Sequence, residues 1–239
     1  MIRSTLILGS TSVVAQALAE QLAASGCRRF HLLARHQAAN QRVAEGLRQR
    51  YGCEVILGSL DLESAARGAP LPLPLDPVDL VLVTAGAIGD TNLASQDPAE
   101  ALAITTATYT GLLPWLVALT APERLESPGR LWVFSSVAGD RGRPSNYPYG
   151  AAKAALTTFC EGLLLRCHGK PFAVRIIKAG YMATPMAVAA PAALCIQPQR
   201  VARILLRRPD RRGIEYLPWW WMPIMLLVRL LPSALAAKL

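Results

Sequence analysis

The sequence predicts a single α/β domain with a doubly wound parallel sheet and an apolar C-terminal extension. Three observations support this fold class. Short apolar runs alternate with longer segments of helical character, which is typical of parallel strands joined by helices. The first apolar run leads directly into a glycine-containing turn. The length of 239 residues suits one large domain with a full core.

The elements follow from these patterns in chain order. Short, largely apolar runs predict the strands Thr5–Leu8, Phe30–Leu33, Glu54–Leu57, Leu80–Val83, Leu131–Phe134 and Ala173–Ile177. Between them we expect the helices Val13–Ser25, Gln41–Tyr51, Asp97–Leu119 and Tyr149–Cys167. In the first helix Val14, Leu18 and Leu22 recur at i, i+4 and i+8, so they form one apolar face.

The chain shows no internal repeat and no linker long enough to separate two domains. Residues 64–78 are rich in Ala, Pro and Leu and predict an irregular link with little helix. We therefore assign residues 1–215 to the domain and residues 216–239 to an apolar C-terminal segment that is not a separate domain.

Two features point to chemistry at the carboxyl ends of the strands. The turn that begins at Gly9 joins a strand to a helix, and helix N–H groups in such a turn bind phosphate. Tyr149 and Lys153 lie four residues apart and share one helix face. A nearby cation favours phenolate, so we expect the Tyr149 phenol to become a better proton donor. In isolation such a pair is more often a surface lysine lying along a tyrosine.

Together these residues resemble the short-chain dehydrogenase/reductase family, which has a Rossmann fold. The matching motifs, in the family's order over about residues 4–190, are Gly9-Ser-Thr-Ser-Val-Val-Ala15, Asp61-Leu62, Val83-Thr-Ala-Gly86, Ser136 with Tyr149 and Lys153, and Lys178-Ala-Gly180-Tyr-Met-Ala-Thr184. The chain departs from the family pattern at Val13 and Ala15, which replace glycines, at Thr108, which replaces an asparagine, and at Ala179, which replaces a proline.

The resemblance implies an NAD(P)-dependent oxidoreductase that converts between a ketone and an alcohol, and a homodimer or homotetramer. The catalytic residues it implies are Ser136, Tyr149, Lys153 and Thr108. The cofactor-binding residues it implies are Gly9, Ser10, Thr11, Ser12, Val13, Val14, Arg35, Asp61, Leu62, Ala85, Gly86, Tyr149, Lys153, Gly180, Met182 and Thr184. The alternative is a catalytically weak NADP(H)-binding sensor or scaffold protein, for which Val13 and Thr108 are the evidence.

The end of the second strand favours NADP over NAD as cofactor. An NAD site places a carboxylate there, whereas an NADP site places a cation near the 2′-phosphate. Ala34 supplies no acid, and Arg35 supplies a guanidinium suited to phosphate. The alternative is that Arg35 is a solvated loop residue.

Charge and composition exclude several other functions. The net charge is +9, but the basic residues are not interleaved with aromatic residues as in nucleic-acid binding, so we expect no nucleic-acid partner. The five cysteines and three histidines show no metal-ligand spacing, which predicts no metal and reduced cytosolic thiols. Because Thr5–Leu8 is already a strand, we expect no signal peptide and a cytoplasmic protein.

The C-terminal segment combines arginine with tryptophan. Six arginines occur in residues 200–212, and Trp219–Trp221 begin an apolar run that Pro223 interrupts. The run is shorter than the roughly 20 residues of a spanning helix, so we expect peripheral contact with a membrane surface. The alternative is a last strand followed by a tail buried in a dimer. The segment also resembles that of decaprenylphosphoryl-2-keto-pentose reductases, which implies a lipid-linked keto-sugar substrate.

Overall fold

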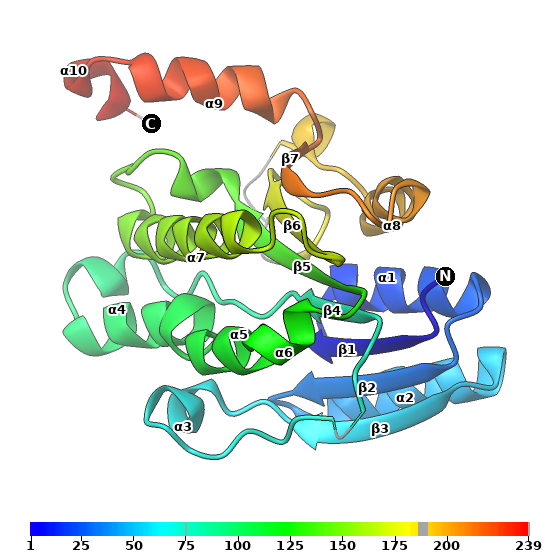
Figure 1. Cartoon of the computed structure of the whole chain (residues 1–239). Helices are drawn as coiled ribbons and strands as arrows, with labels where there is room; N and C mark the ends of the chain where they lie inside the picture. Colours follow the sequence, from blue (N-terminus) through cyan, green and yellow to red (C-terminus); the bar gives the residue numbers. More distant parts are fainter. Residues whose placement is uncertain (75, 186–190, 239) are drawn as a thin grey trace.

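The computed structural model describes residues 1–74, 76–185 and 191–238, which form one α/β domain around a parallel sheet (Figure 1). The sheet has the strand order β3-β2-β1-β4-β5-β6-β7. Its strands are β1 (Ser4–Leu8), β2 (Arg29–Ala34), β3 (Glu54–Ser59), β4 (Leu80–Val83), β5 (Gly129–Ser136), β6 (Phe172–Ala179) and β7 (Gly213–Leu217). The order reverses between β1 and β4, and ligands bind at such a switch point in open α/β sheets. The predicted doubly wound fold is confirmed.

Helices cover both faces of the sheet and enclose two apolar cores. One face carries α1 (Val13–Ala24), α2 (Gln37–Tyr51) and α8 (Pro198–Arg207). The other carries α3 (Leu62–Ala66), α5 (Leu113–Leu119), α6 (Pro122–Leu125) and α7 (Tyr147–Arg166). Strand β4 is buried along its whole length. Burial on both faces explains why the strands read as continuous apolar runs in the sequence.

Helix α2 begins four residues earlier than predicted. Its first turn contains Asn40, which is fully buried and donates a hydrogen bond from Nδ2 to the carbonyl oxygen of Leu32 at 2.9 Å. This polar residue therefore faces the sheet, where the sequence pattern predicted a loop. The described part of the link predicted over residues 64–78 contains little helix, as expected: only the end of α3 falls within it, and Asp61 caps this helix by accepting a hydrogen bond from the Ser64 amide at 2.9 Å.

The long helix predicted over Asp97–Leu119 is interrupted in the middle. Helix α4 (Pro98–Thr105) passes into a π-helical turn, η2 (Thr106–Thr110), before α5 begins. The Gly111 amide donates to the Thr106 carbonyl at 3.0 Å, which is the i+5 pattern. Pro114 follows and has no N–H to continue regular helical bonding. Among the described helices, this stretch alone is long and apolar enough to cross a membrane, and parts of it are buried in the cores.

The C-terminal segment contributes the last strand and then leaves the sheet. Strand β7 pairs in parallel with β6, so the sheet extends two residues beyond the predicted boundary at residue 215. Helices α9 (Trp221–Leu230) and α10 (Ser233–Ala236) follow beyond the β7 edge (Figure 1). Trp221 and Met225 of α9 pack against Val137 in a small core of their own.

Arginines and tryptophans of the C-terminal part of the chain lie at opposite ends of strand β7. Arg207–Arg212 precede the amino end of β7, whereas Trp219–Trp221 follow its carboxyl end. Arg211 pairs with Glu215 at 3.4 Å, and Arg212 donates to the Cys167 carbonyl oxygen at 3.1 Å. Strand β7 therefore separates the arginines of residues 207–212 from the tryptophans, and the peripheral contact of this segment with a membrane stays a prediction.

Candidate active site

A cavity of about 780 Å³, here called the large cavity, opens at the carboxyl ends of β1 to β4. It lies at the point where the strand order reverses. Gly9 begins its wall with a φ of 94°, and a Cβ at this position would come 2.6 Å from the Ala85 amide nitrogen. Only glycine allows both this backbone conformation and this close approach. The cavity has the place and the glycine turn that a dinucleotide cofactor requires.

Half of the predicted cofactor residues line the large cavity. They are Gly9, Thr11, Ser12, Arg35, Asp61, Leu62, Ala85 and Gly86. The other residues predicted from the glycine turn, Ser10, Val13 and Val14, do not line it. The Ser10 hydroxyl is buried and donates to Asn40 Oδ1 at 2.6 Å. Val14 is packed in the core beneath α1. Val13 begins α1, and no described residue other than glycine has a positive φ, so valine is compatible with the turn here.

A second cavity of about 120 Å³, here called the small cavity, contains the predicted reactive hydroxyl groups. It is lined by Ser136 and Tyr149, and by Gly180, Met182 and Thr184 from the loop after β6. Ala87 lines the large cavity and the next residue, Ile88, lines the small one, so the loop after β4 adjoins both. A ligand that fills the large cavity therefore ends beside the small one.

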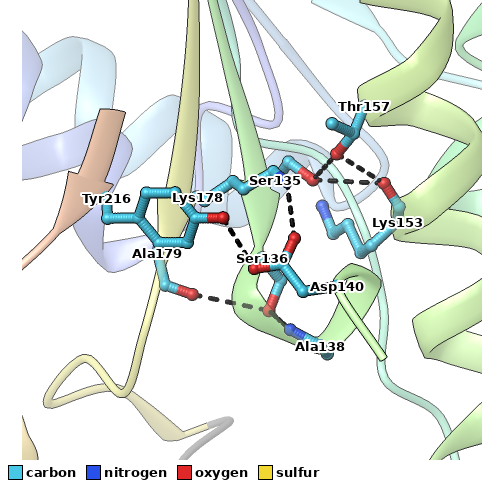
Figure 2. Close-up of polar contacts among 9 residues, drawn as sticks. All are labelled: Ser135, Ser136, Ala138, Asp140, Lys153, Thr157, Lys178, Ala179 and Tyr216. Carbon is cyan, nitrogen blue, oxygen red and sulfur yellow. Dashed lines mark hydrogen bonds and ion pairs between the residues drawn. The ribbon is translucent and has the colours of Figure 1, made fainter. Parts of the chain in front are cut away.

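Ser136 is held at the last position of β5. Its Oγ accepts a hydrogen bond from the Ala138 amide at 3.1 Å and lies 3.5 Å from the Ala179 carbonyl oxygen (Figure 2). The short 3-10 turn η3 (Val137–Gly139) that follows turns the chain away from the sheet. The strand end and the turn together direct the hydroxyl toward the small cavity.

Tyr149 and Lys153 lie on the buried side of α7. Burial raises the pKa of Tyr149 to about 12, and the neighbouring Ser136 acts in the opposite direction. Burial also lowers the pKa of Lys153 to about 8. Burial therefore dominates, and the net pKa of the phenol is raised although the Lys153 ammonium was expected to lower it. The ammonium lies 5.8 Å from the centroid of the tyrosine ring, and desolvation outweighs its field.

Lys153 is fixed by hydrogen bonds along β5. Its Nζ donates to the Phe134 carbonyl oxygen at 2.8 Å. Its own carbonyl oxygen accepts from Ser135 Oγ at 3.2 Å and from Thr157 Oγ1 at 2.8 Å (Figure 2). A Cβ on Gly86 would lie 3.2 Å from Nζ, so the glycine leaves space for the lysine beside the large cavity.

Thr108 is buried in the π-helical turn η2 and is tied to the loop after β4. Its hydroxyl accepts from the Ala87 amide at 3.2 Å and donates to the Ala87 carbonyl oxygen at 3.1 Å. Both hydroxyl interactions are thus used to position the loop that borders the two cavities. In the described parts of the chain the Thr108 hydroxyl bonds to Ala87 and forms no hydrogen bond with Lys153.

A buried network of charged and polar side chains connects the strands around Ser136. It was not predicted from the sequence. Asp140 accepts a hydrogen bond from Lys178 Nζ at 2.5 Å and another from the Tyr216 hydroxyl at 2.9 Å (Figure 2). The network joins the turn after Ser136 to β6 and β7. Lys178 stands within a recognised motif, but the sequence contains no signal that pairs it with Asp140.

The comparison with known families decides the classification. The family described as short chain dehydrogenase matches residues 3–194. The chain belongs to this family. It is therefore an NAD(P)-dependent oxidoreductase enzyme that uses a nicotinamide cofactor. The comparisons do not confirm the narrower resemblance to decaprenylphosphoryl-2-keto-pentose reductases.

This short-chain dehydrogenase has relatives that match nearly all of its length. It is 33% identical over 233 residues to an uncharacterized oxidoreductase of Mycobacterium tuberculosis, covering 95% of this chain and 93% of that protein. It is 33% identical over 245 residues to an uncharacterized oxidoreductase of Streptomyces coelicolor, covering 99% and 96%. Among solved structures, a short-chain dehydrogenase from Sphingobium yanoikuyae in complex with NADPH has a TM-score of 0.78 at 21% identity, covering 91% and 88%.

Proposed function

We propose that this enzyme reduces a ketone to an alcohol with NADP(H), and that Tyr149 is the proton donor. The observation that carries the proposal is the position of Ser136 and Tyr149 in one small cavity beside the large one. A nicotinamide cofactor bound in the large cavity supplies the reducing equivalent.

The chain's own residues provide the acid and the orientation. The raised pKa keeps the Tyr149 phenol protonated at neutral pH, so it can give its proton to the oxygen of a carbonyl group that is being reduced. Ser136 donates a hydrogen bond from its hydroxyl to the same oxygen, keeps its own proton, and holds the carbonyl in place. Lys153 carries a positive charge below its pKa of about 8, and this charge favours transfer of the phenolic proton.

The preference for NADP(H) rests on Arg35. The guanidinium is exposed, lines the large cavity at the end of β2, and forms no ion pair with a carboxylate in the described parts of the chain. The neighbouring His36 ring lies 3.4 Å from its Nη2. An unpaired guanidinium at this position suits the 2′-phosphate that distinguishes NADP from NAD.

Replacement of Arg35 tests this preference. We expect Arg35→Asp to weaken NADPH binding about 10- to 100-fold and to leave NADH binding unchanged or improved, because a charge-assisted phosphate contact is lost. Arg42→Asp makes the same charge change at an exposed position on α2 and serves as the control. Equal affinities of the wild type for NADPH and NADH, measured by cofactor fluorescence, would contradict the preference.

The alternative is a sensor or scaffold that binds NADP(H) without turnover. Its sequence evidence was Val13 and Thr108, and the structure accommodates Val13 at negative φ. Mixing the protein with NADPH and then with a panel of ketones separates the two functions. Cofactor binding followed by NADPH oxidation supports the reductase, and binding without oxidation by any ketone supports the sensor.

An apolar or lipid-linked substrate at a membrane surface is a further part of the proposal. Helix α9 supports it, because Trp221 lines the small cavity while Met222, Leu226 and Leu227 are exposed on the same helix. We also propose a homodimer or homotetramer, since exposed leucines and a valine occur on the helices of one face. These are Leu102, Val117 and Leu165, on α4, α5 and α7. Light scattering of the purified chain tests the oligomeric state.

A further inference from the structure

Three buried polar atoms at the small cavity have no hydrogen-bond partner among the residues that the structure describes. They are Nε of Arg143, Oδ1 of Asn146 and Nε1 of Trp221, and all three residues line the cavity together with Ser136 and Tyr149. Buried polar groups in folded proteins are nearly always paired. Three unpaired atoms around one cavity therefore indicate that a ligand supplies their partners.

Arg143 brings a positive charge that no carboxylate of the described chain neutralises. It lies in the loop between β5 and α7 and forms none of the ion pairs found in the described residues. Asp140, the nearest acidic residue in the sequence, uses Oδ1 for Lys178 and Oδ2 for Tyr216. A partly buried guanidinium without a counter-charge favours an anionic ligand.

Trp221 is far from Arg143 in the sequence but lines the same small cavity, where it adds a fixed hydrogen-bond donor. The residue is only 8% exposed, and its ring meets Tyr181 edge to face with centroids 5.4 Å apart. A Cβ on Gly180 would lie 1.8 Å from the indole Nε1, so glycine is required for the ring to sit where it does. An indole N–H and a guanidinium can only donate hydrogen bonds, and the Asn146 amide can donate after rotation.

We infer that Arg143, Asn146 and Trp221 bind an acidic group, a carboxylate or a phosphate, on the ketone that this enzyme reduces. The inference rests on the proposed ketone reduction and names the substrate class of that same site. The acidic group belongs to the substrate and not to the cofactor, because Arg143 shares the small cavity with Ser136 and Tyr149 whereas Arg35 lines the large one. The carbonyl and the acidic group must lie within one small molecule or on one end of a larger one.

Matched pairs of ketones test this recognition. Acetoacetate is compared with its methyl ester, and dihydroxyacetone phosphate with dihydroxyacetone, in the wild type, Arg143→Gln and Arg143→Lys. We expect Arg143→Gln to lower kcat/KM about 10- to 100-fold for the charged member of a pair, chiefly through KM, because a charge-assisted contact is lost. The neutral member should change little, and Arg143→Lys should restore part of the loss because it keeps the charge.

Two controls separate recognition from folding and from cofactor binding. Arg166→Gln makes the same substitution at an exposed position at the far end of α7 and should match the wild type with all four ketones. The Kd for NADPH should be the same in the wild type and in Arg143→Gln. A lower NADPH affinity in Arg143→Gln without a change in substrate KM would overturn the inference.

Calorimetric binding of acetoacetate and of dihydroxyacetone phosphate to the enzyme loaded with NADP⁺, which has no hydride to transfer to a ketone, gives a readout that does not depend on turnover. Binding of either anion that Arg143→Gln weakens supports the inference, and the anion that binds more tightly identifies carboxylate or phosphate as the group. Charged and neutral ketones that are reduced equally well by both proteins would overturn the inference and leave the proposed reduction standing. Anion binding with no reduction of any ketone would instead overturn the proposed reduction.

Discussion

Tyr149 and Lys153 are displaced from their ordinary pKa values in opposite directions by the same cause. Burial disfavours the charged form of each, so it raises the phenol pKa to about 12 and lowers the ammonium pKa to about 8. At neutral pH the phenol holds its proton and the lysine holds its charge. This pair of states is the one that proton donation to a carbonyl oxygen requires.

The first prediction concerns pH. We expect kcat/KM for ketone reduction to fall as the pH rises through about 8, because Lys153 then loses the charge that assists Tyr149. Between this pKa and the ordinary lysine value the unfolded chain binds more protons at this position, so the contribution of Lys153 to stability rises with pH. Thermal unfolding over the same range therefore separates lost charge from lost structure. Activity that declines only in the ordinary lysine range would contradict the assignment.

The sequence predicted the residues that lie close together in one motif better than those that meet across the fold. Ser136, Tyr149 and Lys153 fall within one stretch, and strand and helix periodicity places them on facing elements. Ser10 was assigned to the cofactor although its hydroxyl is occupied by Asn40, a contact set by how α2 packs. Arg143 and Trp221 come together only through the path of the chain after β7, which no local pattern encodes.

At the scale of elements, local bonding overrode helical periodicity. The apolar pattern over Asp97–Leu119 predicted one regular helix, and composition carries no signal for a π-helical turn. The turn lies just before Pro114, which has no N–H for regular helical bonding, and Thr108 within it bonds to Ala87 on the neighbouring loop. Such turns are frequent at functional sites, and Thr106 and Ala107 of this one line the large cavity.

The exposed face of helix α9 leads to a prediction about membrane binding. Trp221 and Met225 face inward, whereas Leu226 and Leu227 are exposed, so charging the outer face should spare the fold. We expect a Leu226→Glu/Leu227→Glu variant to lose binding to phospholipid vesicles while keeping its turnover of a small ketone. Binding of the wild type to vesicles should survive added salt, because Arg207–Arg212 lie at the amino end of β7, whereas α9 follows its carboxyl end. Flotation with vesicles measures both effects.

The control and the contrary outcome are equally specific. Leu93→Glu places the same charge on an exposed apolar residue of η1 (Leu93–Ser95), away from α9, and should bind vesicles like the wild type. Vesicle binding by the wild type that disappears with salt would point to the arginines. A wild type that ignores vesicles at every salt concentration would remove the membrane part of the proposal and leave the tail to a protein interface.

At the scale of the whole molecule, topology places the chemistry. The strand order reverses between β1 and β4, and the loops after these strands carry Gly9 and the segment that borders both cavities. Alternation of strands and helices was sufficient to predict this sheet from the sequence. The seventh strand was foreseen only as an alternative, and the positions of the tail helices were not predicted. A five-residue strand and a tryptophan-rich run carry no periodicity that shows what they pack against.

The most direct test of the account is a stoichiometry measurement on the wild type and Tyr149→Phe with the same ketones. We expect the wild type to form one alcohol for each NADPH consumed. Tyr149→Phe should bind NADPH with nearly unchanged affinity but lose about 10²–10⁴-fold in rate, because the ring remains and only the proton donor is removed. Tyr149→Phe that reduces a ketone at the wild-type rate would contradict the central claim.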